Sequence, residues 1–195
     1  MWIMFSAPGL LLRAAERSDI PLIAHWMSDP RILKFYGGCD RPLDEEKIRQ
    51  KYFRRRRDPA TGRFYEYRAC IVEVGKTGKP GWQCEVPAAF VQYYRLPPSE
   101  VDMFGYPLYD RSYGFDLFLG EPELWGTGVG SQVVELMRDY LCHMRGAVRV
   151  VLDPRLDNPR DIHAYVKARF RKIRVLPGRE VHEGSARDCQ LMEYP

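Results

Sequence analysis

A glycine-rich turn that leads directly into an amphipathic helix constrains this chain more than any other segment. Residues 125–131 read WGTGVGS, and the positions after them place apolar side chains at intervals of three and four, at Val133, Leu136, Met137, Tyr140, Leu141 and Met144. The first N–H groups of a helix have no partner within it, and the helix dipole adds partial positive charge, so a helix start attracts phosphate. We therefore expect this turn to bind a phosphate-bearing ligand; a plain glycine-rich turn is the alternative.

The spacing of the glycines excludes two common phosphate loops. No Gly-Lys-Ser/Thr follows them, so the turn is not a nucleoside-triphosphate loop. A dinucleotide-binding fold would place G-x-G-x-x-G near the start of a βαβ series, whereas Gly126, Gly128 and Gly130 are spaced G-x-G-x-G and come late in the chain. The ligand has to be inferred from the flanking segments.

The order of elements predicts one α/β or α+β domain over residues 1–195, with a mostly antiparallel first half. Segment 75–81 predicts a hairpin connection, and the proline-rich segment 97–110 predicts a long loop. Strands are expected at 1–12, 65–74, 86–96, 112–120, 147–153, 172–181 and 187–195, and helices within 13–30, 41–57, 128–146 and 157–170.

Composition excludes several classes of protein. The formal net charge is only +4, and the one basic cluster, Arg54 to Arg57, is expected at the solvated end of a helix, so we predict no nucleic-acid partner. Five widely spaced cysteines without a C-x-x-C pair favour reduced thiols in the cytoplasm, and no histidine pair suggests a metal site. The apolar start of the chain is too short to span a membrane. We expect a cytoplasmic monomer or homodimer without a membrane partner.

The segments around the turn resemble the acetyl-CoA-binding half of the Gcn5-related N-acetyltransferases (GNAT). The similarity rests on strand 113–120, the glycine turn with its helix, and the segment DNPRDIHAYVKARF at 157–170. It implies a GNAT fold, with a central mixed, mostly antiparallel sheet flanked by helices, and acetyl-CoA as the cofactor. The cofactor-binding residues implied are Phe118, Leu119, Trp125, Gly126, Thr127, Gly128, Val129, Gly130, Ser131, Asn158 and Tyr165.

Within that family the chain is most similar to the aminoglycoside 6'-N-acetyltransferases. The aromatic pair before Gly37-Gly38, the Gln-x-Tyr pattern on strand 86–96, an aspartate just before the turn and Asp-Pro at 153–154 all match that group. The resemblance implies transfer of an acetyl group to the 6'-amine of an aminoglycoside-like polycation. The substrate-binding residues implied are Tyr36, Gln92, Asp102, Asp116, Asp153 and Glu183.

Two positions depart from the family pattern. Arg169 stands where a glycine usually ends the helix, and because a left-handed cap is costly for arginine we expect that helix to end differently. Trp125 stands where the wider family often has Gln or Arg, which removes one side-chain contact to the cofactor but leaves the backbone amides in place.

The reaction implied needs a neutral amine, a polarised thioester carbonyl and a departing thiolate. An alkyl ammonium has a pKa near ~10.4, so Asp116 and Asp153 are the candidates for attracting the amine and helping to remove its proton. Asp116 is a weak base unless its surroundings raise its pKa, and otherwise orients the amine while water takes the proton. Tyr165 is the candidate proton donor to sulfur, and the N–H groups near Phe118 and Leu119 are candidates for polarising the carbonyl.

Each of these residues also has a structural interpretation. Asp116 and Asp153 can be cap or turn residues, and Tyr165 can be a core aromatic. Three alternative functions stay open beside the first: acylation of another amine, such as a siderophore lysine, a polyamine or a protein N-terminus; coenzyme A sensing without catalysis; and nucleic-acid binding through Arg54 to Arg57.

Overall fold

One mixed sheet of eight strands organises the molecule. The computed structural model describes residues 3–75, 84–108 and 110–195, and the predicted hairpin connection at 75–81 lies almost entirely outside them. The strand order is β1-β2-β3-β4-β5-β6-β8-β7, and all neighbours are antiparallel except β5 and β6. The strands are β1 (Ile3–Ala7), β2 (Leu10–Ala14), β3 (Tyr67–Gly75), β4 (Cys84–Arg95), β5 (Ser112–Leu119), β6 (Arg149–Leu152), β7 (Arg171–His182) and β8 (Ser185–Tyr194).

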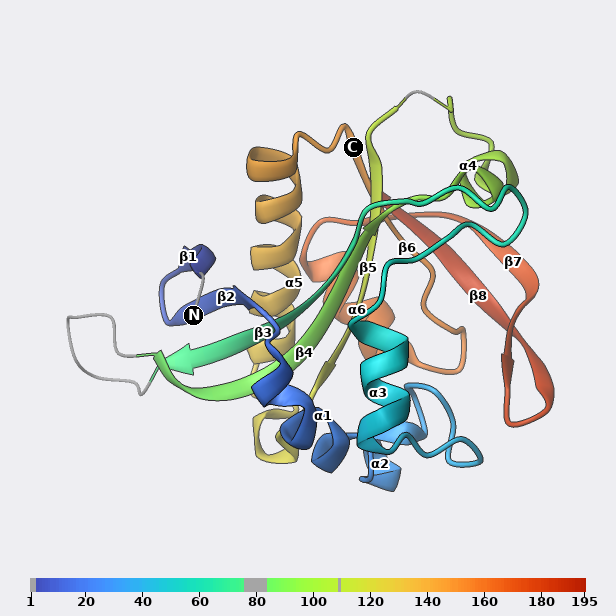
Figure 1. The fold of residues 1–195 in the computed structure, drawn as a ribbon. Coiled ribbons are helices and arrows are strands. Elements are labelled where there is room, and N and C mark those ends of the chain that lie inside the picture. The colour runs from blue at the N-terminus through green and yellow to red at the C-terminus, as the bar shows by residue number, and fades with distance from the viewer. Residues whose placement is uncertain (1–2, 76–83, 109) are drawn as a thin grey trace.

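Helices cover both faces of this sheet (Figure 1). Three short helices, α1 to α3, lie together near one end of the sheet, and α5 runs along the other face. The helices are α1 (Ile20–Trp26), α2 (Pro30–Leu33), α3 (Glu45–Tyr52), α4 (Pro98–Phe104), α5 (Val129–Asp139) and α6 (Pro159–Lys167), with short turns η1 (Arg17–Asp19), η2 (Pro122–Leu124) and η3 (Tyr140–Met144), the last a π-helical turn.

Alternation along the central strands divides the core into two layers. On β3, Cys70 and Val72 pack with α5 and α6, whereas Ala69 and Ile71 pack with the α1–α3 group. This is the period of two expected of a strand buried on both faces. A third cluster, which includes Val101 of α4, joins that helix to β6, β7 and β8.

The sequence predictions hold for most elements; they omit α2, which begins at Pro30 where a helical segment was expected to end, and they fail at three further places. Segment 1–12 was expected to contain one strand, but Gly9 turns with φ +76° and the chain forms the hairpin β1–β2. Segment 97–110 was expected to be a loop but contains α4. The basic cluster 54–57 lies beyond the end of α3 rather than in it, and the guanidinium groups of Arg55 and Arg57 each lie 4.0 Å from the centre of the Phe64 ring.

The described helices include none that combines the length and apolarity needed to cross a membrane.

Candidate acetyl-transfer site

The glycine turn begins α5 in the geometry that a phosphate site requires. Gly126 and Gly128 have φ values of +77° and +94°, in the left-handed region that glycine alone adopts readily. A Cβ at either position would meet no atom within 4 Å, so the turn faces open space. Gln132 makes the first hydrogen bond of the helix, to the carbonyl oxygen of Gly128, which leaves the earlier N–H groups of the first turn without a helical partner.

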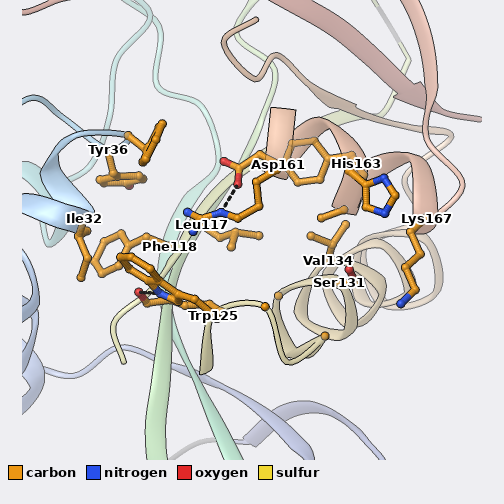
Figure 2. Close-up of a pocket in the computed structure, with 18 of the residues that line it drawn as sticks. Ile32, Tyr36, Leu117, Phe118, Trp125, Ser131, Val134, Asp161, His163 and Lys167 are labelled. Atoms are coloured by element: carbon orange, nitrogen blue, oxygen red, sulfur yellow. Dashed lines mark hydrogen bonds and ion pairs between the residues drawn. The ribbon is translucent and has the colours of Figure 1, made fainter. Parts of the chain in front are cut away.

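A cavity of about 310 Å³ opens in front of this turn. Figure 2 shows Ser131 and Val134 of α5 facing His163 and Lys167 of α6, with Ile32 and Tyr36 on the far side. Besides the acid Asp161, four basic side chains border the cavity: Arg31, Arg160, His163 and Lys167. They form a cationic rim that suits a ligand with several phosphate groups. Sequence analysis missed this rim because its members come from α2 and α6.

The strand before the turn exposes backbone to the same cavity. β5 pairs with β6 only through Ser112, Tyr113 and Gly114, so beyond Gly114 the two strands separate. The N–H of Gly120 bonds to β4, and because β4 and β5 pair without a bulge, alternation directs the peptide groups of Leu117 and Leu119 away from β4, towards the gap. Both leucines line the cavity.

This alternation corrects one prediction. The N–H of Phe118 was expected to polarise the thioester carbonyl, but it points towards β4, while the phenyl ring lines the cavity. Leu117 takes its place as the backbone candidate beside Leu119. At Leu119 the carbonyl oxygen already accepts a hydrogen bond of 3.2 Å from the indole of Trp125, which leaves its N–H as the free group.

A second cavity, of about 260 Å³, meets the first. Leu117 and Tyr165 line both, together with Phe35, Tyr36 and Asp161. Asp116, Gln92 and Asp153, all predicted from the sequence, line the second cavity with Lys51, Arg155 and Glu180, which were not. The structure therefore brings the predicted phosphate site and most of the predicted acids to two connected cavities.

Asp116 is a carboxylate whose surroundings strongly raise its pKa. Its Oδ2 accepts a hydrogen bond of 2.6 Å from Gln92, and the Gln92 carbonyl oxygen accepts one of 2.8 Å from the hydroxyl of Tyr67. Burial first, and then the nearby charge of Asp153, raise the pKa of Asp116 to about 7, although the bond from Gln92 acts in the opposite direction. A carboxylate with this pKa can exchange a proton near neutral pH.

Asp153 differs because it is already paired. Arg179 of β7 donates to its Oδ2 at 2.7 Å and to Glu100 of α4 at 2.6 Å. Burial raises the pKa of Asp153, and the positive charge of Arg179 opposes that change. Asp153 therefore acts on Asp116 through its charge and is less available to a cationic substrate.

Tyr165 lies at the junction of the two cavities with only 8% of its surface exposed. Burial, and then the negative charge of Asp161, Asp116 and Asp153, raise its pKa well above that of free tyrosine. Its hydroxyl therefore stays protonated at neutral pH, as a proton donor must.

Asn158, a predicted cofactor ligand, begins α6. Its side-chain oxygen accepts from the N–H of Asp161, its amide donates to the Asp161 carboxylate at 2.6 Å, and Pro159 is the first helical residue. The predicted N-cap is confirmed. Asn158 lines the second cavity, whereas Thr127 and Val129 border neither, so those two can contribute only backbone groups.

Two predicted substrate residues lie outside both cavities. Asp102 is exposed on α4, while Glu100 on the same helix turns inward to Arg179. Glu183 lies in the β7–β8 turn with φ +50° and accepts a hydrogen bond of 2.8 Å from the N–H of Cys39. Glu180, and not Glu183, lines the second cavity. Their roles stay predictions without a geometric basis.

Comparisons with known proteins agree with this geometry. Residues 81–176 match the model of the acetyltransferase (GNAT) domain. A spermidine N-acetyltransferase from Vibrio cholerae, solved with CoA and spermine, superposes with a TM-score of 0.72 over 96% of each chain, at 19% identity. The chain has the GNAT acetyltransferase fold. This confirms the fold class predicted from the sequence.

Other acetyltransferase structures similar to this chain were solved with different ligands. The aminoglycoside acetyltransferase AAC(6')-Ib with coenzyme A has a TM-score of 0.63 at 17% identity, over 95% of this chain and 94% of that one. The same enzyme with coenzyme A and kanamycin gives 0.62 at 16%, with the same coverage. Identities this low establish the fold alone.

Proposed function

We propose that this protein is an acetyl-CoA-dependent N-acetyltransferase that acetylates a primary amine of a small molecule by direct transfer in a ternary complex. The observation that carries the proposal is the meeting of the two cavities at Leu117 and Tyr165. One cavity has the phosphate-binding helix start and the cationic rim, and the other contains Asp116. The GNAT domain match and the coenzyme A complexes of the similar structures support the choice of cofactor.

Coenzyme A fits the first cavity by its chemistry. The N–H groups at the start of α5 would hold its pyrophosphate, and Arg160 and Lys167 would bind the remaining phosphate charge. The cofactor supplies an acetyl group activated as a thioester. Backbone groups of Leu117 and Leu119 border the cavity along β5, where the N–H groups can hydrogen-bond the carbonyl oxygen and stabilise the charge that develops on it.

Asp116 and Tyr165 then handle the two protons. Asp116 attracts the ammonium form of the acceptor and takes its proton, so that the neutral amine can attack the acetyl carbon. As the carbon–sulfur bond broke, the Tyr165 hydroxyl would donate a proton to the sulfur, and the second proton that the nitrogen loses on becoming an amide would pass, directly or through water, to the resulting Tyr165 phenolate. The site needs no covalent enzyme intermediate, because holding both reactants in line supplies much of the rate.

The acceptor follows less directly from the structure. The family resemblance of the sequence implied an aminoglycoside 6'-amine, and Asp102, Asp116, Asp153 and Glu183 would favour such a polycation if they converged. Only Asp116 and Asp153 reach the cavity, and Asp153 is bound to Arg179. A polyamine is the second candidate, supported by the similarity to spermidine N-acetyltransferase.

A panel of amines tests the proposal. The protein is incubated with acetyl-CoA and kanamycin, tobramycin, spermidine, lysine or a basic peptide, and the products are weighed by mass spectrometry. We expect an added acetyl group on at least one amine, with a rate lowered about 10²–10⁴-fold in Asp116→Asn. Binding of coenzyme A without any acetylated product would instead support a coenzyme A sensor.

A further inference from the structure

Most acids around the second cavity, where the acceptor amine would bind, already have cationic neighbours. Arg179 holds both Asp153 and Glu100, as described above. Glu180 lies 3.9 Å from Arg155, and Asp161 lies 3.9 Å from Arg160. These pairs leave little uncompensated negative charge for a substrate with several ammonium groups.

Of the acids that line this cavity in the described part of the chain, Asp116 is the one that pairs with no guanidinium group. It accepts its hydrogen bond from the neutral side-chain amide of Gln92. The cavity therefore offers one carboxylate to one amine, which matches the proposed reaction but not a polycation.

Lys51 places a positive charge in the same cavity. It lies at the end of α3, and its ammonium group is 5.2 Å from the centre of the Tyr52 ring. Among the residues that the structure describes, it forms no ion pair or hydrogen bond, and none joins it to Asp116. Burial, and then the nearby charge of Arg56, lower the pKa of Lys51, while the charge of Asp116 opposes that change, so a bound anion would favour the charged form of Lys51.

We propose that the acceptor is a small amine that also carries a carboxylate, with Asp116 receiving the amine and Lys51 receiving the carboxylate. This inference rests on the proposed acetyltransferase function and names its substrate class. The cavity, at about 260 Å³, is below the ~300–1000 Å³ usual for drug-sized ligands. Lys51 also repels an acceptor with additional ammonium groups, so one residue both selects the amino acid and rejects the polyamine.

Matched acceptors that differ by one carboxylate test the inference. The rates with 4-aminobutyrate and n-butylamine, and with lysine and cadaverine, are compared as kcat/KM by mass spectrometry. We expect the carboxylate-bearing member of each pair to be preferred by about tenfold or more, mainly through KM, as one charge-assisted contact would give.

Variants of Lys51 show whether that residue is the cause. Lys51→Gln should reduce the preference to about threefold or less and should raise kcat/KM for cadaverine, whereas Lys51→Arg should retain part of the preference. Lys47→Gln is the matched control, because Lys47 lies on the same helix but is exposed and pairs with Asp44 at 3.7 Å.

Two results would overturn the inference while leaving the acetyltransferase proposal intact: equal turnover within each pair, or a preference that Lys51→Gln does not change. If no amine is acetylated although coenzyme A binds, the proposed function fails. Calorimetric titration of 4-aminobutyrate and n-butylamine into the coenzyme A complex then decides the inference separately, since equal or absent binding of the two would contradict it.

Discussion

At the scale of single residues, the acidity of Asp116 controls the proposed reaction. Burial and the neighbouring charge of Asp153 raise its pKa to about 7, and the ionised form is the one that accepts a proton. We therefore expect kcat/KM to rise with pH through about 7, because Asp116 is protonated and inactive below that value. A pH profile from about 5 to 9 with a single acceptor measures this, and Asp116→Asn should lose the inflection together with most of the rate.

In the same experiment, Asp102→Asn tests whether Asp102 belongs to the substrate site, as the sequence predicted, or lies outside it, as the structure places it. Asp102 is exposed on α4 and lines neither cavity, so its variant should keep both the rate and the inflection. A large loss of activity would return Asp102 to the substrate site and contradict the placement of α4.

The site residues that were predicted from the sequence lie close, along the chain, to a recognisable turn or helix start. Asp116 precedes the glycine turn by a short strand segment, and Tyr165 lies two turns into a helix with a clear N-cap. Lys51 and Arg179 could not be found in this way, because α3 and β7 reach the cavity only through tertiary packing. The predicted acids of these segments were misplaced for the same reason: Glu100 of α4 and Glu180 of β7 face inward, and Asp102 and Glu183 do not.

At the scale of secondary-structure elements, residues typical of helix ends gave the clearest predictions. Asn158 with Pro159 predicted the start of α6 correctly. The same signals were present at α4, where Pro98 is the first helical residue and Gly105 is a left-handed C-cap with φ +78°. They were overlooked because the many prolines and aromatics of the segment favoured a loop.

The end of α6 gives a prediction about stability. The helix was expected to end differently for lack of a glycine, but Arg169 adopts the left-handed conformation itself, with φ +70°, and the N–H of Phe170 bonds to the carbonyl oxygen of Tyr165. This conformation costs a non-glycine residue about 1–2 kcal/mol. Arg169→Gly should therefore stabilise the protein by about 1 kcal/mol and raise Tm by about 2–4 °C in a thermal melt.

Arg169→Ala distinguishes relief of backbone strain from loss of the exposed arginine side chain. Alanine keeps the strained φ, so its Tm should stay near that of the wild type. An equal rise in both variants would show that the side chain, rather than the backbone, was destabilising.

At the scale of the whole molecule, the sheet consists of two halves joined along a short seam. Strands β1 to β5 form one half, β6 to β8 the other, and only three residue pairs link β5 to β6 before the strands separate. The sequence predicted a strand on either side of α5, but not where these strands part, because that depends on the packing of both halves. The separation opens the cavity in which β5 presents Leu117 and Leu119.

A ligand in this gap would touch β5 from one half and α6 from the other, so coenzyme A should stabilise the fold as a whole. Binding at about 100 times Kd adds about 2.7 kcal/mol to the free energy of unfolding. Hydrogen exchange should slow in residues 115–119 and at the start of α5, with little change in the β7–β8 hairpin. Protection confined to other elements would place the cofactor elsewhere.

A variant in the glycine turn tests whether that stabilisation comes from binding at the proposed site. Gly128→Ala forces alanine into φ +94° at the helix start, which should cost about 1–3 kcal/mol and shift the N–H groups that hold the pyrophosphate. Gly62→Ala is the matched control: its φ is +67°, a Cβ there also meets nothing within 4 Å, and it borders neither cavity. Both variants should lose stability without ligand, but only Gly128→Ala should lose most of the Tm gain on adding coenzyme A. If both respond to coenzyme A like the wild type, the phosphate does not bind at this turn, because a Cβ and a shifted backbone at Gly128 would then leave binding unchanged.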